Sequence, residues 1–94
     1  MAVTVLLPGV LRAIADGQAK LELDAPVPAT LAGVLDVVAE RYPGLGRRLR
    51  DENRALRRYV NFYVDGEECR YLGGADAPVA ADAEIQVIPS VAGG

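Results

Sequence analysis

The sequence predicts an α+β fold in which a mixed sheet of about five strands packs on one main helix. Three observations predict it. Short segments rich in β-branched and aliphatic residues recur along the chain, separated by turns of glycine, proline or aspartate. A single longer segment repeats its apolar residues with the period of a helix. The chain has 94 residues, of which 51% are hydrophobic and 24% charged, and this suffices for one compact domain but not for two.

The first two strands are expected at residues 3–7 and 19–23. The first is rich in valine and leucine and stops at a turn, Pro8-Gly9. The second alternates leucine with charged residues, so that one face is apolar and the other is charged. We expect it to return beside the first strand as a hairpin partner.

The main helix is expected to begin after Thr30, whose hydroxyl can cap it, and to end near Tyr42, before Pro43. Its apolar residues recur at i, i+3, i+4 and i+7, which predicts one buried face. Residues 44–46 are then expected to form a turn. Residues 45–58, which overlap this turn, carry six arginines, so any helix there is expected to be short and mostly solvated.

Three more strands are expected at residues 59–64, 67–71 and 84–89. Turn residues separate them at 65–66, 73–74 and 80–82. With one main helix in the order β-β-α-β-β-β, this pattern is the ubiquitin-like β-grasp arrangement. We therefore expect residues 1–90 to form a single domain, followed by a flexible tail of residues 91–94.

Alternation along the strands separates a helix-facing side of the sheet from an outer side. The helix-facing residues are expected to be Val3, Val5, Leu7, Val60, Phe62, Val64, Ile85 and Val87. Leu6, Tyr63 and Ile88 then lie on the outer side, where neighbouring apolar residues are typical of a partner-binding surface. Scattered apolar residues are also normal on protein surfaces, and the two interpretations have equal weight at this point.

Composition excludes several kinds of site. The chain has no histidine and a single cysteine, which rules out Ser-His-Asp and Cys-His catalysis, the usual zinc sites and an internal disulfide. Cys69 itself is expected to be an inert, buried thiol, because no histidine can activate it. The acidic residues between 65 and 68 lack the ligand spacing of a calcium loop, so we expect no metal site.

Charge and hydropathy indicate which partners to expect. Residues 41–58 hold seven arginines against two acids, in a chain whose net charge is −3. This run lacks interleaved aromatic residues, so a solvated face or a protein contact is favoured over nucleic acid. The apolar stretches fall short of the roughly 20 residues that a membrane span needs, and no signal peptide is evident. We therefore expect a cytoplasmic protein without nucleic-acid or membrane partners.

The sequence closes with Gly93-Gly94, which presents an α-carboxylate on a backbone with almost no side-chain bulk. A carboxylate is a poor acyl donor, but activation as an acyl-adenylate makes its carbon electrophilic. Glycines would let such a tail enter a narrow channel in a partner enzyme. Alone, a Gly-Gly end is a weak signal, and a frayed terminus is the plain alternative. In combination with a β-grasp pattern it becomes a strong one.

The end of the chain, residues 82–85 and 88–94, resembles that of the small sulfur-carrier proteins of molybdopterin, thiamine and cysteine biosynthesis. Within that family the chain most resembles the thiocarboxylate carrier of cysteine biosynthesis. This resemblance rests on Val3-Thr4-Val5, Pro8, Leu11-Arg12, residues 59–64, Arg70, Gly73-Gly74 and residues 91–94. The Phe-Ala signature that often follows the first strand of molybdopterin-type carriers is absent. Ala83 stands where the turn commonly has glycine.

The resemblance implies a carrier protein rather than an enzyme, with no cofactor bound to the carrier. A partner enzyme would consume ATP to adenylate Gly94, and a sulfur donor would convert the adenylate to a thiocarboxylate. A cysteine synthase containing PLP would accept the sulfur, and a metallopeptidase would release the cysteine. Val91, Ala92 and Gly93 would thread the active sites of these partners.

Other functions use the same features. A small sulfur-carrier subunit for molybdopterin or thiamine biosynthesis is one alternative, because it would use the same tail chemistry. A ubiquitin-like modifier, conjugated to protein lysines through Gly94, would need the same tail and the same activation. A passive β-grasp interaction module with an accidental Gly-Gly end is a third alternative, and removal of the two glycines distinguishes it, because such a module would keep its affinity.

Overall fold

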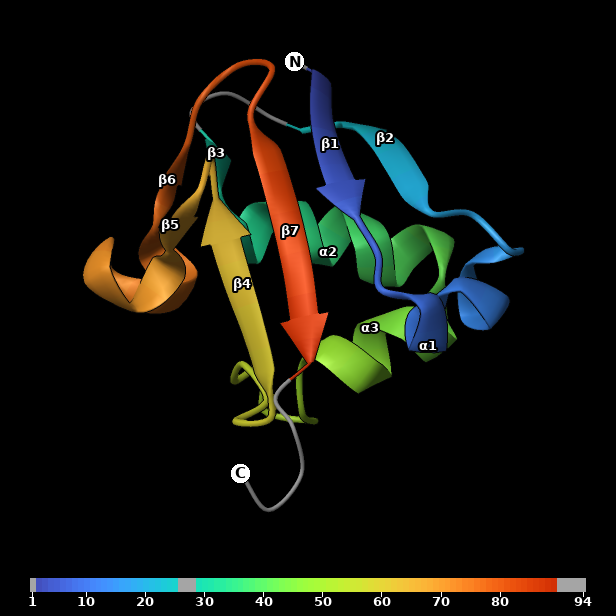
Figure 1. Cartoon of the computed structure of the whole chain (residues 1–94). Coiled ribbons are helices and arrows are strands. Elements are labelled where there is room, and N and C mark those ends of the chain that lie inside the picture. Colours follow the sequence, from blue (N-terminus) through green and yellow to red (C-terminus); the bar gives the residue numbers. More distant parts are fainter. Residues whose placement is uncertain (1, 26–28, 90–94) are drawn as a thin grey trace.

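The structure is a computed structural model and describes residues 2–25 and 29–89. Its five-stranded mixed sheet has the order β2-β1-β7-β4-β5, with the last strand of the sequence in the centre. β1 (Ala2–Leu6) runs antiparallel to β2 (Lys20–Asp24) and parallel to β7 (Glu84–Pro89). On the other side of β7 lies β4 (Val60–Val64), antiparallel to it, and the two-residue β5 (Glu67–Glu68) follows (Figure 1). The predicted α+β fold with five strands is confirmed.

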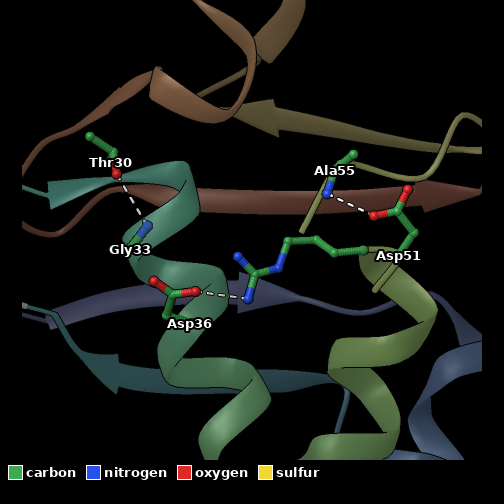
Figure 2. Close-up of polar contacts among 6 residues, drawn as sticks. Thr30, Gly33, Asp36, Asp51 and Ala55 are labelled. Carbon is green, nitrogen blue, oxygen red and sulfur yellow. Dashed lines mark hydrogen bonds and ion pairs between the residues drawn. The ribbon is translucent and has the colours of Figure 1, made fainter. Parts of the chain in front are cut away.

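The main helix, α2 (Leu31–Arg41), crosses one face of the sheet (Figure 1). It begins where the sequence predicts, because Thr30 Oγ1 accepts a hydrogen bond from the N–H of Gly33 at 3.1 Å (Figure 2). It ends as predicted with Tyr42 as its C-cap. The apolar face of α2 is buried against the sheet, and every strand residue predicted to face the helix is buried as well. The core therefore lies between the sheet and α2.

The connection between β1 and β2 is helical where the sequence predicted only a turn. α1 (Gly9–Arg12) directly follows Pro8, and the 3₁₀ turn η1 (Ala13–Ala15) continues it. Leu11 and Ala15 are buried, so this short segment closes one end of the core. A single helical turn contains too few residues for a periodicity to stand out, which is why the sequence did not reveal it.

A second helix, α3 (Pro43–Leu49), starts as soon as α2 has ended. The prediction that residues 44–46 form a turn is wrong, because they lie inside this helix. Gly46 packs directly on α2: a Cβ added there would lie 2.6 Å from Ala39 Cβ, so only glycine allows this approach. The helix is short, as predicted, but it is not mostly solvated, since both of its leucines are fully buried.

Arg50, at the end of α3, links that helix to α2. Its side chain is only 7% exposed, and its Nη2 lies 2.9 Å from Asp36 Oδ1 (Figure 2). The next residue, Asp51, uses its carboxylate to accept hydrogen bonds from the N–H groups of Asn53 (2.8 Å) and Ala55 (3.0 Å). The chain between α3 and β4 is therefore fixed at its start by side-chain contacts.

Two very short strands, β3 (Ala29–Thr30) and β6 (Pro78–Val79), form a separate antiparallel sheet that the sequence did not predict. The return strand expected at 67–71 is shorter than predicted, because after β5 the chain turns into the 3₁₀ turns η2 (Cys69–Tyr71) and η3 (Gly74–Asp76). The turns predicted at residues 65–66, 73–74 and 80–82 are confirmed by positive φ angles at Asp65, Gly66, Gly73, Gly74 and Asp82. Among the described residues, no helix is long and apolar enough to cross a membrane.

Candidate functional site

The candidate site is the end of β7, from which the Gly-Gly tail continues. β7 pairs with β1 only as far as Gln86, opposite Leu6, whereas its pairing with β4 extends to Pro89, opposite Val60. The last residues of β7 are thus held on one side only. Figure 1 shows this end of β7 beside the start of β4. The five residues that follow Pro89 can reach at most about 17 Å when fully extended.

The opposite end of β7 is fixed by the turn after β4. Asp65 adopts a left-handed backbone conformation with a φ of 48°. Its N–H donates to the carbonyl of Glu84 at 2.8 Å, and its carboxylate Oδ1 accepts from the N–H of Glu84 at 2.9 Å. These two bonds set the register of β7 at its first residue, and so they also set the position at which β7 ends.

The predicted tail residues lie outside the described part of the chain. These are Val91, Ala92, Gly93 and Gly94. The role predicted for these residues therefore stays a prediction.

Leu6, Tyr63 and Ile88 lie on three neighbouring strands and on the predicted outer side of the sheet. Leu6 and Tyr63 are half-buried, and both pair with Gln86, which separates them. Ile88 is 37% exposed and lies two residues further along β7. The three side chains thus share one face, but an exposed polar residue interrupts the apolar surface.

A groove of about 370 Å³ runs beside the end of β7 on the β1 side, and we call it the β1 groove. It is lined by Leu6, Leu7, Pro8, Arg12, Ala19, Lys20, Gln86, Val87, Ile88 and Pro89. Leu6 and Ile88 belong to it, whereas Tyr63 does not. Arg12 is held in place by a hydrogen bond of 3.1 Å from its Nε to the carbonyl of Leu7.

Pro8, Arg12 and Lys20 also line the β1 groove, and their place there was not predicted from the sequence. They come from α1, its preceding residue and the start of β2, and only the helical connection after β1 brings them to the end of β7. An apolar surface flanked by two cations suits a partner with an apolar centre and an acidic rim.

A second groove of about 380 Å³ lies on the other side, along β4, and we call it the β4 groove. It is lined by Leu56, Arg57, Arg58, Val60, Asn61, Phe62, Glu68, Cys69 and Arg70. Cys69 is buried, and this burial raises the pKa of its thiol, while a hydrogen bond from the backbone of Phe62 opposes the rise. Its thiol therefore stays protonated at neutral pH.

The sequence profile of the ThiS family matches residues 5–94. The chain belongs to the ThiS family. Among curated proteins, the sulfur carrier protein CysO of Mycobacterium tuberculosis and that of Mycobacterium bovis are similar to it. Each is 34% identical over 96 residues, and the match covers 100% of this chain and 100% of the relative.

Solved structures of similar proteins agree with this assignment. A chain in the BexX/CysO complex of Amycolatopsis orientalis is 35% identical with a TM-score of 0.84, and the match covers 99% of this ThiS-family chain and 100% of that one. CysO of Mycobacterium tuberculosis is 33% identical with a TM-score of 0.80, over 95% and 99%. The small archaeal modifier protein 1 of Methanosarcina acetivorans is 28% identical with a TM-score of 0.81, over 99% and 96%.

These comparisons confirm both the β-grasp fold and the resemblance to small sulfur-carrier proteins. The structure also explains why alanine fits at position 83. The left-handed residue of this turn is Asp82, with a φ of 61°, and Ala83 is buried in the core instead. A glycine at that position would lose this apolar contact.

Proposed function

We propose that this ThiS-family chain is a sulfur carrier that works through a thiocarboxylate at Gly94 and supplies sulfur for cysteine biosynthesis. The observation that carries the proposal is the match along the whole length to proteins named sulfur carrier protein CysO. The position of β7 is consistent with this role, because the tail would leave from the end of the central strand of the sheet, beside the start of β4.

The chemistry begins with activation of the tail. A carboxylate oxygen of Gly94 attacks the α-phosphorus of ATP, pyrophosphate leaves, and an acyl-adenylate forms. Sulfur at the level of hydrosulfide, released from a sulfur donor, then attacks the acyl carbon and AMP leaves, so that the C–O bond to AMP is replaced by a C–S bond and a thiocarboxylate remains. The carrier has no catalytic group of its own in this scheme; the activating partner consumes ATP and the sulfur donor and supplies the catalysis.

The carrier would then deliver its sulfur to a PLP-dependent cysteine synthase. The activating group leaves the β-carbon of an activated serine, and the thiocarboxylate sulfur forms its bond to that carbon. The acyl group then moves from sulfur to the amino nitrogen of the same residue. This leaves cysteine in amide linkage to Gly94, and a metallopeptidase releases it by hydrolysis. Val91, Ala92 and Gly93 would reach into each active site, which places the nucleophile at its target.

The surface around the end of β7 would recognise these partners. Leu6 and Ile88 line the β1 groove, and Tyr63 extends the same face of the sheet towards β4. Substitution of Ile88 with Asp would place a charge in that contact and weaken partner binding without unfolding the domain, because the side chain is outside the core. Unchanged affinity for the activating enzyme and the synthase would remove this surface from the proposal.

The central test is the mass of the chain isolated from its native cell, measured with and without alkylation. An alkylatable sulfur mapped to Gly94 by fragmentation, or a cysteine residue attached there, would be the expected result. The cysteine adduct would also identify the pathway, since molybdopterin or thiamine biosynthesis would not produce it. Oxidation of Met1 or Cys69 adds nearly the same mass as replacement of oxygen by sulfur, so the fragment position decides.

Conjugation to other proteins is the second candidate function. It is favoured by the likeness to small archaeal modifier protein 1 over nearly the whole of both chains. An unmodified carboxylate in the free chain, together with Gly94 linked to lysines of other proteins, would support this function and contradict the thiocarboxylate mechanism.

A further inference from the structure

The β4 groove carries a positive charge in an otherwise acidic chain. Its walls hold three arginines, Arg57, Arg58 and Arg70, against one acidic residue, Glu68, while the whole chain has a net charge of −3. Two of these arginines come from residues 45–58, which we call the arginine-rich segment, and the third comes from η2, twelve residues later than the second. The fold therefore gathers cations that are separated in the sequence.

The three arginines are not equally available to a ligand. Arg70 is already engaged, because its Nε lies 2.6 Å from Glu68 Oε1 and its Nη2 donates to Asn61 Oδ1 at 2.7 Å. Arg57 uses its Nε to donate to the carbonyl of Arg47 at 2.9 Å, which leaves the outer nitrogens of its guanidinium. Arg58 is exposed and makes no hydrogen bond or ion pair to another residue of the described ranges. One or two guanidinium groups thus remain open to an anion.

The groove borders a stretch of β4 that has no neighbouring strand among the described residues. β5 pairs only with Tyr63 and Val64, so the edge of β4 from Val60 to Phe62 faces the groove. The N–H of Val60 is already in use, since it donates to the carbonyl of Arg57 at 3.2 Å, and the backbone of Phe62 interacts with the buried thiol of Cys69. A partner strand added at this edge would not find the N–H of Val60 free to donate a hydrogen bond. We therefore expect a partner to be recognised by the side chains of the groove.

A tyrosine follows two of the three groove arginines in the sequence. Tyr59 follows Arg58 and is 55% exposed, and Tyr71 follows Arg70 and is 83% exposed. Tyrosine and arginine are the residues most enriched where protein interfaces gain their affinity. The groove also lies one strand away from the exit of the tail, because Val60 in its lining pairs with Pro89, and neighbouring strands are about 4.8 Å apart.

We infer that the β4 groove binds carboxylates on the surface of the activating enzyme that receives the tail. This inference rests on the proposed function, because that enzyme must hold the chain while Gly94 reacts. An acidic protein surface fits better than a nucleic acid: few guanidinium groups are open, Glu68 lies among them, and the chain as a whole would repel a polyanion. Guanidinium groups pair with carboxylates in a planar, two-bonded geometry.

The test is the kinetics of adenylation, followed by ATP-pyrophosphate exchange, with the carrier as the varied substrate. Arg58→Glu is expected to raise the KM for the carrier about tenfold and to leave kcat unchanged, because it removes a docking contact and no reacting group. The effect should shrink between about 0.01 M and about 0.15 M ionic strength, as screening weakens it. Arg58→Lys keeps the charge and should recover part of the loss.

Arg48→Glu is the matched control, since it makes the same change of charge at an exposed arginine of the same segment that lies outside both grooves. An equal rise in KM for Arg48→Glu and Arg58→Glu would overturn the inference, because net charge alone would then explain the effect. A second result would also overturn the inference. In that case Arg58→Glu leaves the KM for the carrier unchanged, but the wild-type chain binds a single-stranded oligonucleotide and Arg58→Glu abolishes this binding. If the wild-type chain is not adenylated at all, the proposed function fails as well. If it is adenylated and all variants have equal KM values, only the docking role of the β4 groove fails.

Discussion

Arg50 and Arg58 belong to the same arginine-rich segment, yet they lie in opposite environments. Arg50 is buried, and its guanidinium holds α3 to α2 through Asp36. Arg58 is exposed and lines the β4 groove. The segment thus has an inner side, Gly46, Leu49 and Arg50, and an outer side, Arg48, Arg57 and Arg58. Burial and contacts with neighbouring elements, and not residue type, therefore decide whether an arginine stabilises the fold or is available for binding.

The largest effect on stability is expected from Gly46→Ala on the inner side. The new Cβ would lie 2.6 Å from Ala39 Cβ and 2.8 Å from Ala39 Cα, so the backbones of α2 and α3 must separate. We expect a loss of about 2 kcal/mol in the free energy of unfolding, from an overpacking cost that exceeds the gain in helix propensity. Denaturant unfolding followed by circular dichroism measures it.

Gly44→Ala is the matched control for this substitution. Gly44 lies in the same helix, but a Cβ there would meet no atom within 4 Å. It should therefore stabilise the chain by about 0.5–1 kcal/mol through helix propensity alone. If both alanine variants are stabilised equally, α2 and α3 do not approach as closely as the structure has them.

A smaller loss is expected from Asp36→Ala, which removes the partner of Arg50. It leaves a buried guanidinium without its ion pair, but the Asp36 side chain is 51% exposed, so water can replace part of the contact. We expect a loss of about 1–2 kcal/mol, consistent with a charged hydrogen bond. Glu40→Ala, an exposed acid on the same helix, should change stability by no more than about 0.5 kcal/mol.

A double-mutant cycle with Arg50→Ala sharpens the same point. If Asp36→Ala has no further effect in the Arg50→Ala background, the loss belongs to the pair. If the two losses simply add, the stability contributed by Arg50 comes from the packing of its aliphatic stem and not from Asp36.

The sheet and α2 could be predicted from the sequence because their signals are local and repeated. Thr30 caps the helix, and alternation along β1, β4 and β7 assigns each residue to a face. The short elements could not be predicted, since β3 and β6 have two residues each and owe their pairing to each other. From the sequence Gly46 resembled a turn residue. Glycine is required there because the position packs directly against Ala39 on another helix, and this contact is not visible in the local sequence.

The candidate site was predicted only in part for the same physical reason. Leu6 and Ile88 follow from alternation, and the Gly-Gly ending is visible in the sequence. The two grooves depend on residues that the fold brings together from separate segments, such as Arg12 with Ile88, or Arg58 with Arg70. No local sequence pattern predicts that residues so far apart in the chain lie in one groove, so only the three-dimensional structure reveals it.

The smallest effect on stability is expected at Cys69, a buried residue in the lining of the β4 groove. Burial raises the pKa of its thiol, and the nearby Glu68 raises it too, while the backbone of Phe62 and the charge of Arg70 lower it. The folded chain therefore binds this proton more tightly than the unfolded chain. The resulting stabilisation is present below the ordinary thiol pKa of about 8.5 and is lost as the pH rises through the folded value.

Unfolding curves measured from neutral to alkaline pH should accordingly show a small loss of stability in the wild type that is absent from Cys69→Val. Alkylation gives an independent measurement, because a protonated, buried thiol reacts slowly. If native Cys69 instead reacts as fast as the unfolded chain, the lining of the β4 groove is open to solvent and the outer side is less ordered than the inner side. Slow reaction would mean that a rapidly alkylated sulfur on the folded chain belongs to a thiocarboxylate at Gly94, since Cys69 is the sole cysteine.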